Sequence, residues 1–399
     1  MRRIFFTILS LFLSSGSMAE NPLPLCVLDP AKMPESWRPS ADVQKGLYPA
    51  PWSESESKDA EYAIKTGLNE MISYFERKPS AIKSLGDDAI EALIQVTYSS
   101  DNKPEFDAMV RDAARNNLTA LITPFLDLNP ESAICDEFED LLPLAIFAHK
   151  LYSANDTRTD VVTKRTNAAY RACGSLEIAM GNNFQKILAD KGARPKDLEV
   201  LFDLYIWCLW FIEAELFPDI KLPVETHKFG PEVWKYFKNY RLAGATEFEN
   251  RARDEKFIKI ADLATHIAHI PTGAHRFPLY IQDSPGLYRF HRENFYPVMH
   301  TGELDLFASF VDSLRQYGCT AENDMQVRDG TRYLLKAFHD GKDRWMDYRQ
   351  DGETNSNIDD YGLIHYPWTA VLGVRARQLE QPNPGTYGSI VRRWLPHSG

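Results

Sequence analysis

The sequence lacks the motifs that would place it quickly in a known class of enzyme. It contains no GxSxG, Walker, GxGxxG or HExxH pattern, which disfavours serine hydrolases, nucleotide-dependent enzymes and zincin proteases. It also has no run of five or more Lys or Arg residues, and its net charge is −11. A nucleic-acid-binding surface is therefore not expected.

Cysteine is scarce, with five residues and no CxxC spacing, which argues against a zinc knuckle. An odd number leaves at least one thiol unpaired in an oxidising compartment, and Cys208, inside an apolar stretch, is the expected buried free thiol. Cys135 and Cys173 lie about equally far from a turn near Asn155 that separates two predicted helices. At about 1.5 Å per residue they would lie level on antiparallel helices, so we predict a disulfide between them.

Long apolar runs are few, and the first one lies at the N-terminus. Arg2 and Arg3 precede the apolar residues 4–13, and small and polar residues 14–19 follow. This order is typical of a secretory signal peptide, and about ten apolar residues are too few for a membrane span of about 20. We predict a signal peptide over residues 1–19, a mature chain that begins at Glu20, and a secreted or periplasmic protein.

The second apolar run, residues 201–212, is interrupted by Asp203 and is also too short to span a membrane. We expect a buried helix there and no membrane span. Apolar residues recur at helical spacing through much of the chain, without a convincing run of strand-like alternation. Helices are predicted near 60–77, 90–97, 106–113, 132–152, 158–178, 196–216, 232–268, 301–318 and 323–339.

This pattern predicts an all-α fold of stacked antiparallel helix hairpins in a single domain over residues 58–399. Residues 20–57 differ from it, because they are rich in proline and serine and carry isolated aromatic residues such as Trp37 and Trp52. Two interpretations of this segment remain open. It is either an extended arm that packs on the helical body through its rings, or a flexible leader.

One stretch of the chain resembles a known family. The residues 334–341 (LLKAFHDG), then Trp345, and then 365–371 (HYPWTAV) resemble a repeat of the α/α-toroid proteins, the terpenoid-cyclase and prenyltransferase-like folds. The resemblance, confined to residues 334–371, implies inner and outer helices around a central cavity. The DxDD signature of the cyclases and the zinc ligands of the prenyltransferases are absent, so it does not imply their chemistry. We expect no cofactor and no metal ion.

The histidines gather in the last third of the chain, where eight of the ten lie. His266 and His269 are three residues apart and would share a helix face. Pro271 and Gly273 would end that helix and leave His275 in a loop. Three interpretations of these imidazoles are open: an acid/base pair, metal ligands, or polar residues at a helix end within a cleft.

The following segment combines rings with cationic groups. Tyr288, Arg289, His291 and Arg292 would suit a sugar-binding groove, because Arg pairs with carboxylates and a Tyr/His pair can transfer protons in a lyase. The same pattern is also that of an ordinary amphipathic helix.

A second polar and aromatic loop runs over residues 355–368 and contains His365 and Trp368. Asp359 or Asp360, with a partner such as Glu293, would alternatively supply a carboxylate pair for glycoside hydrolysis.

Together these features favour an exported, carbohydrate-active enzyme, a lyase or a hydrolase, that acts on an acidic or envelope glycan. The predicted catalytic residues are His266, His269, Tyr288 and His291, and the predicted substrate-binding residues are His275, Arg289, Arg292, His365 and Trp368. The alternatives are a non-catalytic binding or assembly protein of the envelope and a metal-dependent hydrolase. Convergence of the histidines on one cavity would favour the enzyme.

Overall fold

A computed structural model describes residues 24–85, 88–97, 104–153, 155–181, 184–189, 198–345, 360–374 and 383–395. The predicted signal peptide lies outside this part. No strand occurs in the ranges described, and the chain order is that of successive helices, so the all-α prediction is confirmed. No helix within these ranges has the length and apolarity that crossing a membrane requires.

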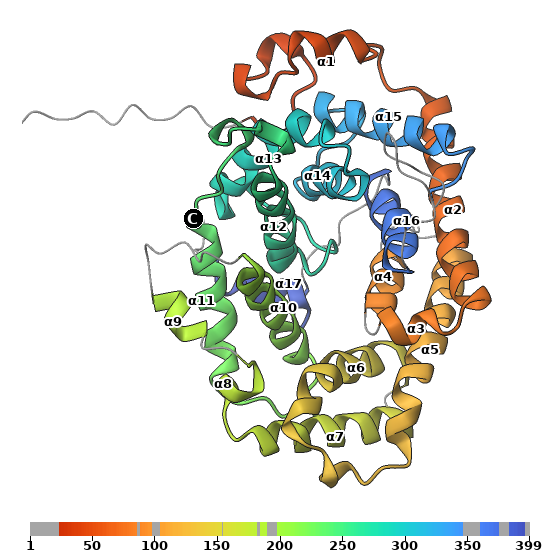
Figure 1. Cartoon of the computed structure of the whole chain (residues 1–399), viewed down its shortest axis with the longest axis vertical. Helices are drawn as coiled ribbons and strands as arrows, with labels where there is room; N and C mark the ends of the chain where they lie inside the picture. Colours follow the sequence, from red (N-terminus) through yellow and green to blue (C-terminus); the bar gives the residue numbers. More distant parts are fainter. Residues whose placement is uncertain are drawn as a thin grey trace, which may run out of the picture.

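The longer helices are arranged in two concentric sets around the middle of the molecule (Figure 1). The inner set is α4 (Asp88–Thr97), α6 (Phe138–Leu151), α10 (Glu199–Ala214), α12 (Glu255–Thr272), α14 (Leu304–Gln316) and α16 (Asp360–Val374). The outer set is α2 (Glu54–Arg77), α5 (Pro104–Leu126), α7 (Thr157–Cys173), α11 (Thr226–Lys238), α13 (Pro285–Met299) and α15 (Met325–Asp340).

Helices of the two sets alternate along the chain and pack on one another. The inner helices α6, α10, α12, α14, α16 and α4 contact one another in that order, and α5 packs on both α4 and α6. Because α7 packs on α6, α11 on α10, α13 on α12 and α14, and α15 on α14 and α16, each inner helix is covered from outside. The inner helix α10 is accordingly apolar on most of its faces.

Shorter helices lie at the periphery and in the connections. They are α1 (Ala41–Gly46), α3 (Ala81–Leu85), α8 (Leu176–Ala179), α9 (Phe184–Ala189) and α17 (Tyr387–Arg392). Single 3₁₀ turns are η1 (Pro30–Lys32), η2 (Glu35–Trp37), η3 (Pro130–Ser132), η4 (Cys135–Glu137), η5 (Ala245–Glu247), η6 (Arg251–Arg253) and η7 (Ile281–Asp283).

Some predicted helices were wrong in their extent: 158–178 is α7 followed by part of α8, and 106–113 is only the first part of α5. The stretch 232–268 is not one helix but the end of α11 and most of α12, separated by residues 239–254 with two 3₁₀ turns. Gly244 lies in this connection, and Asp254 begins α12 by accepting a hydrogen bond from the Lys256 amide at 3.0 Å. An N-cap of this kind starts a new helix, because it satisfies an amide that the helix leaves unpaired.

The cysteines form two disulfides. Cys135 and Cys173 are paired, with their Cα atoms 4.6 Å apart, which confirms the prediction. Cys208 is the buried free thiol, as expected. The second disulfide, Cys26–Cys319, joins residues 293 positions apart and was not predicted.

The segment before α2 packs on the outer helices α13 and α15. Trp37 is buried and contacts the Tyr288 ring edge-to-face at 5.8 Å between centroids. The Val27 amide donates to Asp324, at the start of α15, and the Met325 amide donates to the Val27 carbonyl. Residues 24–53 thus form an arm, with the short elements η1, η2 and α1, that is fixed by hydrogen bonds and a disulfide.

Candidate active site

The site begins where α12 ends. Its C-terminus is at Thr272, and Gly273 caps it in the left-handed conformation with φ of 59°. Ala274 and His275 continue with φ of 51° and 73°, a conformation that residues with a Cβ rarely adopt. The predicted helix end is therefore confirmed, and it delivers His275 to the loop in a strained backbone.

A buried carboxylate holds His275 in that conformation. The Nδ1 atom of His275 hydrogen-bonds the Asp312 carboxylate on α14, and the side chains of His275 and Asp312 are 4% and 0% exposed. Gln316, one turn further along α14, donates from Nε2 to the same carboxylate oxygen at 3.0 Å. Backbone strain of this kind persists only where the surroundings enforce it, and it concentrates at functional sites.

His269 packs against His275, with 4.0 Å between the ring centroids. The Tyr205 hydroxyl, on α10, lies 3.0 Å from His269 Nδ1, whereas Nε2 is buried and has no hydrogen-bond partner. Burial lowers the pKa of His269 well below its usual range, and the neighbouring His275 and His266 lower it further. The ring is therefore neutral near pH 7, and when Nδ1–H donates to the tyrosine oxygen, Nε2 is left as a base.

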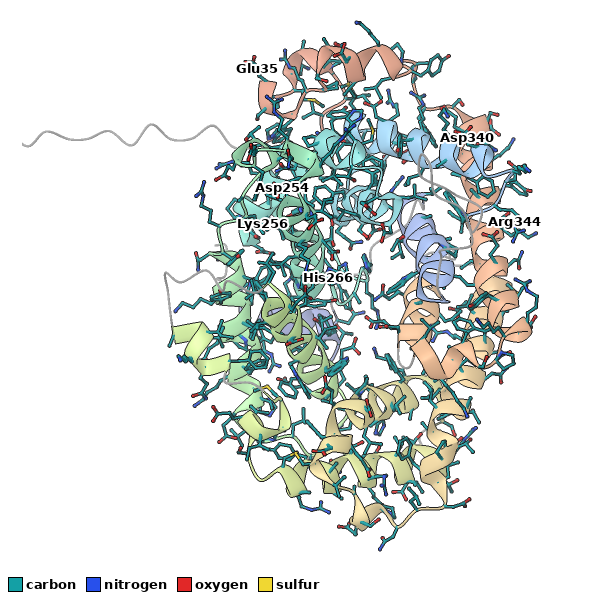
Figure 2. All side chains as sticks on the ribbon, in the orientation of Figure 1. Glu35, Asp254, Lys256, His266, Asp340 and Arg344 are labelled. Atoms are coloured by element: carbon teal, nitrogen blue, oxygen red, sulfur yellow. A yellow bond between two sulfur atoms is a disulfide. The ribbon has the colours of Figure 1, made fainter. Side chains whose placement is uncertain are left out.

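His266 has the opposite tendency. Burial lowers its pKa, but the Asp262 carboxylate, 3.3 Å from Nδ1, more than compensates and the net shift is upward. The Asp262 carbonyl oxygen also accepts from Nδ1 at 2.9 Å. Figure 2 shows His266 on α12, next to the middle of the ring of helices.

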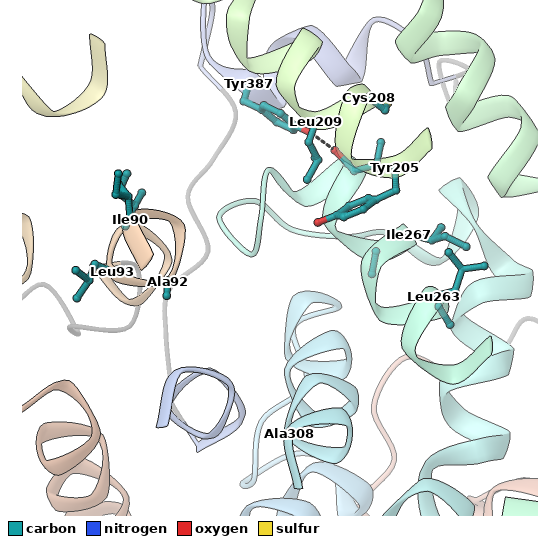
Figure 3. Packing of buried hydrophobic residues seen from close by; sticks show 14 of the residues in the cluster. Ile90, Ala92, Leu93, Tyr205, Cys208, Leu209, Leu263, Ile267, Ala308 and Tyr387 are labelled. Atoms are coloured by element: carbon teal, nitrogen blue, oxygen red, sulfur yellow. Dashed lines mark hydrogen bonds between the residues drawn. The ribbon is translucent and has the colours of Figure 1, made fainter. Parts of the chain in front are cut away.

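His266 and His269 are thus two imidazoles, 5.5 Å apart between centroids, whose pKa values are shifted in opposite directions. Such a pair supplies an acid and a base at one pH, because one ring holds its proton while its neighbour lacks one. The Tyr205 hydroxyl beside them keeps its proton, because burial raises its pKa well above the usual range. In Figure 3 this hydroxyl is directed toward the helix that carries Ile90 and Ala92.

A small pocket, of about 30 Å³, lies between α4, α6, α10 and the loop after α12. Its polar lining comprises Glu91, Gln95, Lys150 and Glu213, and Ala274 contributes from the loop. Ala274 adjoins His275 in sequence, and the charge of Glu91 raises the pKa of both His266 and Tyr205. The lining includes neither His266 nor His269, however, so the predicted convergence of the histidines on one cavity is not seen in this pocket.

Two other predicted site residues, Tyr288 and Arg292, bind the arm through hydrogen bonds. The Tyr288 hydroxyl donates to the Pro24 carbonyl at 2.7 Å, and burial raises the pKa of Tyr288 to about 12. Arg292 is completely buried, and its guanidinium donates to Asp324 at 2.9 Å and to the Leu25 carbonyl at 2.6 Å. The predicted uronate contact for Arg292 has no support here, because protein groups occupy its donors.

The other predicted site residues do not belong to the His266–His269 pair. His291 is fully buried on α13 against Phe310, and it is one of the neighbouring groups that lower the pKa of His269. Arg289 on α13 and Trp368 on α16 are half-buried. The His365 side chain lies outside the described part.

The alternative carboxylate pair is not brought together in the part described. Asp359 and the Asp360 side chain lie outside it, and Glu293 is exposed on α13, where it accepts from the Ser36 hydroxyl at 3.3 Å. Metal ligation also finds no support among the residues with described side chains. The group with suitably close ligand atoms there is Cys26, Cys319 and Asp324, and its two sulfurs form a disulfide.

Sequence reasoning missed the partners of the histidines. Tyr205, Asp312 and Glu91 lie on three different helices, far from α12 in sequence, and none stands in a recognisable motif. The available signal was a tyrosine inside the apolar stretch 201–212, since buried polar groups require partners. Comparison with known protein families, characterised proteins and solved structures gave no match.

Proposed function

We propose that this chain is an enzyme that acts on a glycan by general acid–base catalysis at the His266–His269 pair. The observation that carries the proposal is the His266–His269 pair, whose ring centroids are 5.5 Å apart and whose pKa values are shifted in opposite directions. His269 is the base at Nε2 and His266 is the acid. Tyr205 and the His275–Asp312 pair position the His269 ring.

The same pair would serve a lyase or a hydrolase. In both reactions one group removes a proton, from a sugar carbon or from water, and another protonates the leaving oxygen. Incubation with a panel of polysaccharides distinguishes them, because a lyase forms an unsaturated product that absorbs in the ultraviolet, whereas both form reducing ends.

Replacement of the pair tests the proposal. We expect His269→Gln to lower kcat at least about 100-fold, the usual contribution of a positioned acid or base, with helical circular dichroism and melting temperature nearly unchanged. His300→Gln, at an exposed histidine that ends α13, is the matched control and should keep full activity. If His269→Gln folds and retains activity, the catalytic assignment fails. Binding of a glycan without turnover would favour the non-catalytic alternative.

The pH profile gives an independent check. Activity should rise as pH increases through the lowered pKa of His269 and fall as pH increases through the raised pKa of His266. His266→Gln should therefore remove the alkaline limb of kcat/KM and leave the acidic limb. A profile with both limbs unchanged in that variant would contradict the role of His266.

We also infer that the helices form an α/α toroid and that the protein is exported. The two concentric sets of helices support the first inference, and two disulfides support an oxidising compartment. N-terminal sequencing of protein recovered from the secreted or periplasmic fraction should begin at Glu20. A sequence that begins at Met1 would refute the signal peptide.

A further inference from the structure

The last described helix, α17, packs against the proposed site. It contacts both α10, which carries Tyr205, and α12, which carries His266 and His269. Tyr387, the first residue of α17, is 2% exposed, and Figure 3 shows its hydroxyl directed into the core. A helix from the far end of the sequence therefore touches the two helices that carry the acid–base pair and its tyrosine.

The Tyr387 hydroxyl completes the hydrogen bonding at the end of α12. A helix leaves its last carbonyl groups without an amide of its own. The amides of residues 273–277 donate to His269 and Thr272. The Ile270 carbonyl, between these two, accepts from the Tyr387 hydroxyl at 2.6 Å. Loss of the hydroxyl would leave this buried acceptor without that partner, which is costly.

The Tyr387 ring covers the turn that follows α12. A Cβ at Gly273 would lie 2.8 Å from Tyr387 Cδ1, so the ring packs directly on this glycine. The ring is also nearly parallel to that of Phe277, with 6.5 Å between centroids. Residues 273–275 all have positive φ, and backbone strain of this kind persists only where the surroundings enforce it. Tyr387 therefore holds the turn from one side, as Asp312 holds its last residue from another.

The turn matters to the site because it returns His275 to His269, with 4.0 Å between the ring centroids. Burial is the largest cause of the lowered pKa of His269, and His275 is the next. The other ionisable groups near this ring are Tyr205 on α10, His266 on α12, His291 on α13 and Asp312 on α14. A loosened turn admits water and lets the two rings separate. Both leading causes then weaken, and the pKa of His269 rises toward its usual value.

We propose that Tyr387 is a positioning residue of the site, and that α17 keeps His269 in the buried, neutral state of a base by anchoring the turn over residues 273–275. Tyr387 acts through this turn and not through contact with a substrate. The catalytic role of His269 rests on the proposed function, whereas the effect of Tyr387 on that ring does not depend on turnover.

Tyr387→Phe removes the hydroxyl and keeps the ring. An NMR titration of the His269 ring, assigned from the His269→Gln protein, should give a midpoint at least about half a pH unit higher in this variant, the effect of one lost buried hydrogen bond. Tyr296→Phe is the matched control, because the buried Tyr296 hydroxyl donates to Asp329 at 2.7 Å, away from the turn, and its midpoint should equal that of the native protein. An unchanged midpoint in Tyr387→Phe, or an equal rise in the control, would overturn the proposal.

Kinetics give a second readout. The acidic limb of kcat should move to higher pH in Tyr387→Phe by the same amount as the NMR midpoint, with KM nearly unchanged. A changed KM with an unmoved limb would contradict the positioning role. A raised midpoint in a protein that turns over no glycan would uphold the role of Tyr387 and refute the proposed function. Turnover of a glycan with an unchanged midpoint would do the reverse.

Circular dichroism shows whether each variant folds. If Tyr387→Phe does not fold, hydrogen exchange of the native protein in low urea decides. The amides of Arg276 and Phe277, which donate to the Thr272 carbonyl, should lose protection together with the Ile390 amide of α17, because one opening exposes them all. Exchange in the turn while the Ile390 amide stays protected would contradict the anchoring of the turn by α17.

Discussion

At the scale of single residues, His291 is a fully buried imidazole whose surroundings favour the neutral ring. Burial lowers its pKa to about 4, although the Leu287 carbonyl accepts from Nδ1 at 2.9 Å, and the adjacent Arg292 contributes in the same direction as burial. Between pH 6.5 and 4 the unfolded chain therefore binds a proton at this residue that the folded chain does not. The folded state loses stability as pH falls through this window.

We expect His291→Leu to remove this part of the acid sensitivity. Between pH 7 and pH 5 the native protein should lose about 2 kcal/mol more unfolding free energy than the variant, because one pKa unit corresponds to about 1.4 kcal/mol. Urea unfolding followed by circular dichroism at both pH values measures the difference. Parallel losses in the two proteins would show that His291 is protonated in the folded state.

At the scale of the element, the crossing of α14 and α16 depends on a glycine. A Cβ at Gly373 would lie 2.8 Å from Leu334 Cδ1 and 2.9 Å from the Ala308 carbonyl oxygen. Ala308 is the small residue of α14 that is labelled in Figure 3. Because one of these neighbours is backbone, it cannot move aside as a flexible side chain would.

Gly373→Ala should therefore be destabilising by about 1–3 kcal/mol, the usual cost of inserting a methyl group into a packed core. Gly286→Ala is the matched control, because Gly286 lies in the first turn of α13 and a Cβ there would meet nothing within 4 Å. Thermal melting should show a lower Tm for the first variant and an equal or higher Tm for the second. Equal melting of both variants would mean that the two helices can separate at little cost.

At the scale of the whole molecule, the arm connects the start of the described chain to the outer helices. The disulfide Cys26–Cys319 and the buried ion pair Arg292–Asp324 lie at one point, where the arm meets α13 and α15. Further along, Arg332 on α15 donates to the Ala50 carbonyl at 2.9 Å. The arm therefore stabilises the packing of α13 and α15 from outside.

Replacement of both Cys26 and Cys319 by Ala should loosen this connection. We expect faster hydrogen exchange in residues 24–53 and in the first turn of α15, and a loss of about 2–5 kcal/mol of unfolding free energy. Cys135→Ala with Cys173→Ala is the control, and should lower stability without faster exchange in the arm. Unchanged exchange in the arm of the first variant would show that the hydrogen bonds suffice to hold it.

The sequence was sufficient for features that depend on local chemistry. Helical periodicity predicted the all-α class, and Pro271 and Gly273 predicted the end of α12. The Cys135–Cys173 pairing followed from counting residues on either side of one short turn. The prediction of one helix over 232–268 was wrong because apolar residues recur at helical spacing across the connection between α11 and α12. The sequence signal for a new helix is Asp254, which is the N-cap of α12.

The tertiary structure alone decided which polar residues work together. The sequence suggested the histidines of α12, but only the folded chain brings Tyr205, Asp312 and Glu91 near them. The ion pair between Arg292 and Asp324 likewise forms only in the folded chain. The physical reason is that helix periodicity and caps are set by neighbours within a few residues, whereas burial and charge at a site depend on segments far apart in the chain. The sequence therefore identified the histidines as candidate site residues, but it could not predict their pKa values or their hydrogen-bond partners.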